Sequence, residues 1–284
     1  MHYVAMAVLM SVTVSVLLKL APRFRVDVAQ AVAWNYLVAA LLAVWLLDPA
    51  PVAWRGAGVP WVALALLAVL LPGVFLVLAA SVRYAGIVRS DAAQRLSLLI
   101  PLAAAFLVFG ERLTAAKAAG VVLGGLALLA LLARGGSAPG VAGPPRRLLA
   151  MLCPAAVFAG FGVIDVLFKR VAQAGMPLGS ALVGLFAVAL PLALAWPLLR
   201  HWRGVRRLDL RSFAGGVLLG AANFVNILFY LKGHRALPAH PALVFAGMNL
   251  GVVALGTLVG LALFRERLHA LNLAGIGLAL AAIG

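Results

Sequence analysis

Residues 109–120 read Phe-Gly-Glu-Arg-Leu-Thr-Ala-Ala-Lys-Ala-Ala-Gly, and residues 264–275 read Phe-Arg-Glu-Arg-Leu-His-Ala-Leu-Asn-Leu-Ala-Gly. Seven positions are identical at the same spacing. The chain has two glutamates, Glu111 and Glu266, and both lie in this repeated segment. A segment that recurs in this way, once in each half of the chain, predicts an internal duplication.

The sequence around these segments is strongly apolar. Of the 284 residues 65% are hydrophobic and 11% are charged, with a mean hydropathy of +1.14. The apolar residues form runs of roughly 20, the length that a helix needs to cross a bilayer. We therefore predict an all-α, polytopic membrane protein with ten transmembrane helices, over residues 2–21, 28–47, 60–82, 88–110, 113–133, 148–170, 178–199, 212–231, 238–263 and 268–284.

The duplication sets the domain organisation. Residues 134–147 are rich in glycine and proline and form the one extended linker. We predict a first five-helix repeat over residues 1–134, a linker over 135–147 and a second five-helix repeat over 148–284. Because five is odd, the second repeat enters the membrane from the opposite side, which makes the two repeats inverted copies of each other.

The net charge of +16 comes from basic residues in the short gaps between apolar runs. Such charges set membrane topology, so we expect no nucleic-acid partner. One cysteine and five scattered histidines offer no metal spacing, and no phosphate-binding Gly-Lys-Ser/Thr loop is present. We expect no metal, no cofactor and no ATP hydrolysis, with the lipid bilayer and a small-molecule solute as partners and a monomer or homodimer as the assembly.

The corner motif resembles one of a known family. The Phe-x-Glu-Arg-Leu corners followed by a Gly-containing helix, together with Lys19 and Lys169 at the ends of the first helix of each half, are similar to the EamA-like domain of the drug/metabolite transporter superfamily. The resemblance covers essentially the whole chain. It implies a ten-helix secondary transporter, not an enzyme, that moves small metabolites by alternating access, and we expect it in the inner (cytoplasmic) membrane.

Three polar side chains of the eighth span share one helix face: Asn223, Asn226 and Tyr230. An amide inside a membrane needs a partner, because no water reaches it. The three side chains either bind solute in a cavity or join helices by hydrogen bonds, the role that we also expect for Asn249 and Asn35. We name Asn223, Asn226, Tyr230 and Asn249 as candidate substrate-binding residues.

The first span has a polar stripe formed by Ser11, Ser15 and Lys19. In the sixth span, Asp165 is at the position equivalent to Ser15 and Lys169 at the position equivalent to Lys19. The two lysines either reach from the helix end to the membrane surface or face the cavity as cations that bind an anionic or zwitterionic solute. Asp165 and Lys169 are also spaced to pair with each other. Ser15, Lys19 and Lys169 are further candidate substrate-binding residues.

The fourth span opens with Asp91 and Arg95, which must enter the membrane because too few apolar residues follow them. They form either an intrahelical ion pair at the interface or a site in which Arg95 binds a carboxylate or phosphate. If transport is coupled to protons, Asp91 and Asp165 are the intramembrane acids that could carry them. At the corners, we expect Glu111 and Glu266 to cap the helix that follows each of them.

We predict an exporter or exchanger of small polar metabolites such as amino acids or organic anions. The alternatives are an intramembrane lipid-modifying enzyme, which needs clustered acids or histidines, and a non-transporting assembly subunit, in which Asn223, Asn226 and Tyr230 would tolerate alanine. The orientation stays open. Fifteen Lys/Arg against seven in alternate gaps place both termini outside, whereas the resemblance implies termini in the cytoplasm.

Overall fold

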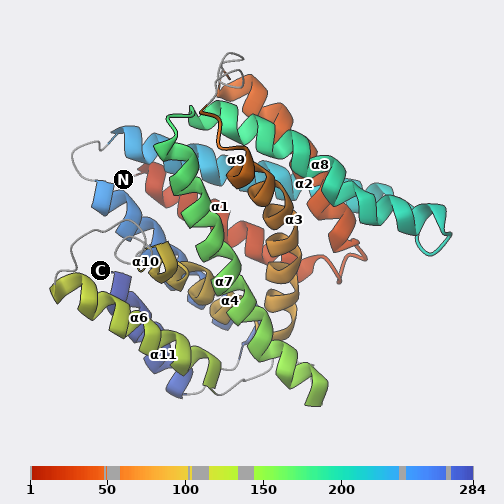
Figure 1. The fold of residues 1–284 in the computed structure, drawn as a ribbon. Helices are drawn as coiled ribbons and strands as arrows, with labels where there is room; N and C mark the ends of the chain where they lie inside the picture. Colours follow the sequence, from red (N-terminus) through yellow and green to blue (C-terminus); the bar gives the residue numbers. More distant parts are fainter. Residues whose placement is uncertain are drawn as a thin grey trace. The chain divides into compact units, whose positions relative to one another are not determined.

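The chain folds into helices in this computed structural model, which describes residues 2–47, 49, 58–101, 103, 115–133, 144–236, 241–266 and 270–283. Helices occupy most of the described residues of the predicted spans (Figure 1), and no strand occurs in these ranges. Their bounds are α1 His2–Leu20, α2 Val28–Leu46, α3 Trp61–Tyr84, α4 Ile87–Leu96, α6 Ala115–Ala133, α7 Pro144–Gln173, α8 Leu178–Trp202, α9 Leu210–Ala236, α10 Pro241–Ala262 and α11 Ala270–Ile283.

Six of the described helices are long and apolar enough to cross a membrane. They are α1, α2, α3, α7, α8 and α9. Such helices satisfy every backbone hydrogen bond internally, which the bilayer core requires. This architecture is consistent with a polytopic membrane protein, as predicted. Of the predicted linker, residues 135–143 lie outside the described part of the chain.

Proline interrupts one of the described helices but not two others. α3 runs through Pro72 and α8 through Pro191, although a proline inside a helix removes one backbone hydrogen bond. α4, by contrast, ends at Leu96 and a turn follows at Ser97, four residues before Pro101. A proline ring clashes with the carbonyl four residues earlier, so Pro101 explains where α4 stops. The predicted fourth span is therefore interrupted.

The helices divide into two compact units. Unit 1 consists of Met1–Lys19, Val77–Val163 and Asn226–Gly284, and holds α1, α4, α6, α10 and α11. Within it α10 packs on α4, and α6 and α11 lie side by side (Figure 1). Two apolar clusters form its core, one around Val88, Leu96 and Val253 and the other around Val8, Val12 and Val252.

Unit 2 consists of Leu20–Leu76 and Ile164–Val225, and holds α2 and α8 with parts of α3, α7 and α9. α2 and α8 pack against each other in opposite directions. The start of α8 at Gly179 lies against Leu47 at the end of α2, and Tyr36 stacks near Phe186 with 6.1 Å between ring centroids.

Glycines let α9 approach α2 closely. A Cβ added to Gly216 would overlap the Trp34 Cβ, and one added to Gly220 would lie 2.8 Å from the Asn35 carbonyl oxygen. Small residues four positions apart commonly form such interfaces in membranes.

We predict that Gly220→Ala destabilises the protein by about 1–3 kcal/mol, because the methyl group meets backbone that cannot move aside. Gly73→Ala in α3 is the matched control, since nothing lies within 4 Å of the added Cβ. There alanine's better helix propensity is expected to leave stability unchanged or raised by about 0.5–1 kcal/mol. Thermal unfolding in detergent measures both variants, and equal melting temperatures would refute the close contact.

Candidate functional site

Two helices of unit 1 face each other through matched polar side chains. Ser11 of α1 accepts a hydrogen bond from Arg95 Nη2 of α4 at 2.6 Å. One turn further along α1, Ser15 donates to Asp91 Oδ1, also at 2.6 Å. Each step of four forward on α1 thus meets a step of four backward on α4, so the two helices run antiparallel.

A third pair continues this series at the end of α1. Lys19 Nζ lies 3.1 Å from Glu266 Oε1 and 3.2 Å from the Val82 carbonyl oxygen. The same carboxylate accepts hydrogen bonds from the backbone N–H groups of Ile87, at 2.7 Å, and Val88, at 3.3 Å. We call the three pairs Ser11–Arg95, Ser15–Asp91 and Lys19–Glu266 the polar ladder.

The Glu266 carboxylate has two roles in the described part of the chain: it caps the start of α4, and it pairs with Lys19. Residues 267–269, at the start of the helix that follows Glu266, lie outside the described part. A role of Lys19 in solute binding stays a prediction. The site is tight. A Cβ on Gly86, which has a φ of 93°, would lie 2.5 Å from the Glu266 carboxylate. Glu111 lies outside the described residues.

α10 closes the ladder from another side. The Asn249 side-chain oxygen lies 3.4 Å from Arg95 Nη1, so this predicted site residue does join Arg95. Gly256 lies against Asp91, where an added Cβ would be 2.6 Å from Oδ2. Asp91 and Gly256 are in contact, as are Val88 and Gly260, so α10 and α4 also run antiparallel.

Asp91 is the exceptional member of the ladder. Its side chain is 2% exposed, and its Oδ2 accepts no hydrogen bond from any residue that the structure describes. Asp91 Oδ1 accepts the hydrogen bond that Ser15 donates, and the intrahelical pair of Asp91 with Arg95 stays a prediction. Buried polar groups are nearly always bonded, and an exception often marks a functional role. A carboxylate oxygen in this position can accept a proton or a cationic group.

The predicted asparagine face makes hydrogen bonds between helices. The Asn223 amide donates to Asn35 Oδ1 at 3.3 Å within unit 2, and the Asn226 amide donates to the Ala7 carbonyl oxygen at 2.7 Å within unit 1. Tyr230 packs against the cluster around Val8 and Val12. These bonds fit the helix-joining interpretation, and a role in solute binding stays a prediction.

The structure says less about the residues of the second half that are equivalent to Ser15 and Lys19. Asp165 is half-buried in unit 2, and the side chain of Lys169 is outside the described part. Of the ladder, Ser11 and Glu266 were not predicted as site residues. The stripe on α1 and the matching four-residue spacing of Asp91 and Arg95 were the signal that could have identified Ser11.

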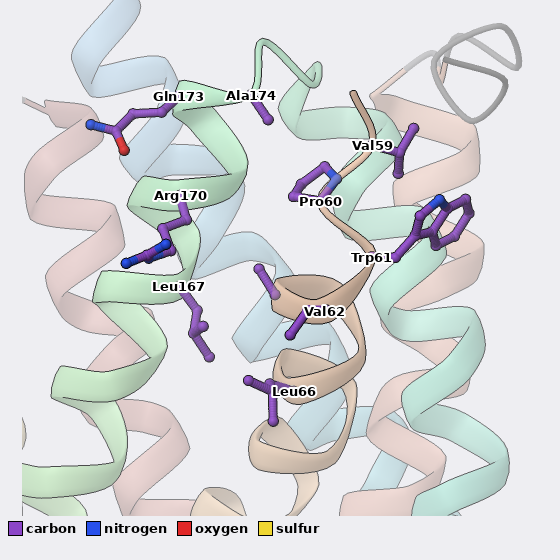
Figure 2. A pocket seen from close by; sticks show the side chains of 10 residues that line it. Val59, Pro60, Trp61, Val62, Leu66, Leu167, Arg170, Gln173 and Ala174 are labelled. Atoms are coloured by element: carbon purple, nitrogen blue, oxygen red, sulfur yellow. The ribbon is translucent and has the colours of Figure 1, made fainter. Parts of the chain in front are cut away.

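A groove in unit 2 does not resemble a site for a polar solute. It has a volume of about 760 Å³ between the start of α3 and the end of α7, and Leu66 and Leu167 point toward each other across it (Figure 2). Its lining is mainly apolar, with Arg170 and Gln173 as its charged and amide side chains. Polar solutes need several convergent polar groups, which the ladder has and this groove lacks.

Comparisons with known proteins place this helical membrane architecture in a family. No family model matches the chain. An uncharacterized protein of Haemophilus influenzae (strain ATCC 51907 / DSM 11121 / KW20 / Rd) is 41% identical over 291 residues, which cover 100% of this chain and 96% of that protein. The chain belongs to the same family as this Haemophilus protein.

A solved structure is similar in fold. It is described as the crystal structure of a protein, and the similarity covers 98% of this chain and 94% of the other, with a TM-score of 0.57 and 17% sequence identity. The likeness at this identity concerns the fold alone.

Proposed function

We propose that the chain is a secondary transporter of the drug/metabolite type in the inner membrane, which exports or exchanges small polar metabolites by alternating access. It consists of two inverted five-helix repeats, over residues 1–134 and 148–284. The observation that carries the proposal is the polar ladder, in which one carboxylate oxygen of the buried Asp91 accepts no hydrogen bond from the part of the chain that the structure describes.

The helix pairs support the inverted repeat. α2 and α8 are the second helices of their halves, α4 and α10 belong to the fourth, and α6 and α11 are the fifth. Equivalent helices of the two halves therefore pack together. In the first two pairs the partners are antiparallel, which is the arrangement expected of a bundle and its upside-down copy and not of a parallel duplication.

The ends of α4 support a moving element. The helix begins after Gly86, whose positive φ suits a hinge, and it stops at the turn before Pro101. A ten-residue helix with a break at each end can tilt without bending. Its tilt would separate Asp91 from Ser15 and Arg95 from Ser11, and would open these charged groups to a solute. Interrupted helices form the binding sites of many secondary transporters.

The ladder favours a solute that carries a carboxylate or phosphate. Arg95 presents a forked, permanently charged donor, which matches both groups. Burying its charge in the bilayer is costly, so it needs partners in every state of the cycle. In the conformation seen here, which we call the closed state, Ser11 and Asn249 are the hydrogen-bond partners of Arg95. In the open state, in which α4 has tilted, the solute takes their place.

Exchange in proteoliposomes tests this proposal. Vesicles loaded with unlabelled amino acids, sugar phosphates or nucleosides are expected to take up the labelled counterpart of at least one carboxylate- or phosphate-bearing solute in a saturable manner. We expect Asp91→Asn to lower uptake driven by a pH gradient about tenfold or more, since its carboxylate is buried and incompletely bonded, whereas the half-buried Asp165→Asn keeps it.

One result would contradict the proposal, namely the absence of exchange for every solute although the protein is folded and correctly inserted. A second result concerns proton coupling alone. If neither aspartate variant changed a pH-driven flux, proton transfer through an acidic side chain would be eliminated, and exchange without proton coupling would remain.

A further inference from the structure

A positively charged surface of unit 2 is formed by residues at the end of α1 and α8 and at the start of α2 and α9. Arg23 and Arg25 lie in the turn between α1 and α2, and the other arginines lie at the end of α8, in the turn that follows it and at the start of α9. We call this surface the arginine platform, and its seven arginines are Arg23, Arg25, Arg200, Arg203, Arg206, Arg207 and Arg211.

Internal bonds hold the platform in shape. Asp27 Oδ2 lies 3.1 Å from Arg200 Nη1 and 3.3 Å from Arg206 Nε. Arg206 also donates to the Arg25 carbonyl oxygen at 3.4 Å, and the Gln30 side chain donates to the Arg207 carbonyl oxygen at 3.0 Å. These bonds tie the two turns together, so the charges are arranged by the fold.

Most of the positive charge remains uncompensated. The two aspartates of this region are Asp27, which is occupied by Arg200 and Arg206, and Asp209, which binds the Ser212 backbone and hydroxyl. Six of the seven arginines are exposed. Five of them make no ion pair with any described residue, namely Arg23, Arg25, Arg203, Arg207 and Arg211.

Large apolar side chains are interleaved with these arginines. Trp202 is 78% exposed and Leu210 is 79% exposed, and Phe24 and Val205 project from the same two turns. A surface that faces only water rarely presents such side chains together. Arginine heads beside tryptophan, phenylalanine and leucine suit the boundary of a bilayer, where the apolar parts enter the acyl region and the cations meet headgroups.

We propose that the arginine platform is a binding site for anionic phospholipid headgroups. The four helices whose ends form it, α1, α2, α8 and α9, are all long and apolar enough to cross a membrane, so the platform lies at a membrane boundary. The phosphate binds the exposed arginines that lack acidic partners, while Trp202, Phe24 and Leu210 anchor the surface. This inference does not depend on transport activity.

Competition between lipids for the protein surface tests whether the arginine platform binds anionic headgroups. The full chain is reconstituted in bilayers of phosphatidylcholine that contain brominated phosphatidylglycerol or, in parallel, brominated phosphatidylcholine, and the quenching of tryptophan fluorescence reports which lipid is bound. Trp202→Phe identifies the part of the signal that comes from the platform. We expect the wild-type protein to prefer phosphatidylglycerol about tenfold, and less so at high salt.

The double variant R203Q/R207Q removes two exposed charges without touching the bonds to Asp27, and we expect it to lose most of this preference. R146Q/R147Q is the matched control, because it removes two exposed arginines at the start of α7 and should keep the preference. The inference is overturned if the wild-type protein shows no preference or if the two double variants lose it equally. It is also overturned if inorganic phosphate or an acidic peptide removes the preference at concentrations that leave the ionic strength unchanged.

Discussion

Arg95→Gln is expected to lower the exchange of carboxylate- or phosphate-bearing solutes about a hundredfold. Arg95 is the ladder's permanent cation, and it bonds Ser11 and Asn249 when the site is closed. A hydrogen bond to a charged group contributes about 1.5–3 kcal/mol, and the upper part of this range corresponds to two orders of magnitude in rate or affinity. Glutamine keeps two N–H donors and hydrogen bonds to the ladder but loses the charge.

Arg83→Gln is the control for this variant, because Arg83 is an exposed arginine of the same unit whose guanidinium lies over the Tyr84 ring. We expect its exchange rate to match that of the wild-type protein. Arg95→Lys should fall between the two, since lysine keeps the charge and loses the forked geometry. Exchange by Arg95→Gln within twofold of wild type would show that Arg95 does not bind the solute.

Glu266→Ala is expected to lower the stability of the folded protein by about 3 kcal/mol. The substitution leaves Lys19 without its carboxylate and leaves the Ile87 and Val88 N–H groups at the start of α4 uncapped. Removing one partner of a buried ion pair costs about 3–5 kcal/mol, and losing a cap costs about 1 kcal/mol. Because Lys19 keeps some contact with water and with the Val82 carbonyl oxygen, the lower part of this range applies.

The midpoint of thermal unfolding in detergent measures this loss, which corresponds to roughly 6–10 °C. Lys232→Ala serves as the control, because Lys232 is exposed and lies over the Phe229 ring. The variant Lys19→Ala/Glu266→Ala should melt higher than the sum of the single losses predicts, since the two charges interact. Equal midpoints for Glu266→Ala and Lys232→Ala would show that the capping contact does not support α4.

The helices could be predicted from the sequence because an apolar segment in a membrane must make all its backbone hydrogen bonds within itself. A helix does this whatever its neighbours are. The bounds of α7 and α9 were less predictable. α7 begins at Pro144 and α9 ends at Ala236, beyond the apolar runs, because a helix continues through polar residues once it is formed. The interruption of α4 follows from Pro101, but the same residue type left α3 unbroken at Pro72. The surroundings of a proline decide between these outcomes, and the sequence does not show them.

The site was only partly predictable. The four-residue spacing of Ser11 and Ser15, and that of Asp91 and Arg95, identify two polar helix faces. Which side chains meet depends on the register between α1 and α4, which packing sets over a separation of more than seventy residues. The contact of Glu266 with α4 spans 179 residues to Ile87. A carboxylate beside a helix start indicates a capping role, but its nearest helix in the chain need not be the helix that it caps.

The two halves differ where the site lies. Ser11 and Ser15 on α1 correspond to Phe161 and Asp165 on α7, and the repeated corner motif aligns Asp91 with Ala246 on α10. The duplication thus explains the shared helix pattern, whereas the ladder's charged residues other than Glu266 belong to the first half. Under the proposed function, one half supplies most of the groups that contact solute and the other supplies the packing against which α4 moves.

Accessibility of position 11 tests the account most directly, because it needs no knowledge of the solute. Ser11→Cys is made in a Cys153→Ser background, which removes the chain's one natural cysteine, and a membrane-impermeant thiol reagent is applied to right-side-out and to inverted vesicles. Alternating access at the polar ladder predicts modification from both sides. Modification from one side only, or from neither, would contradict it.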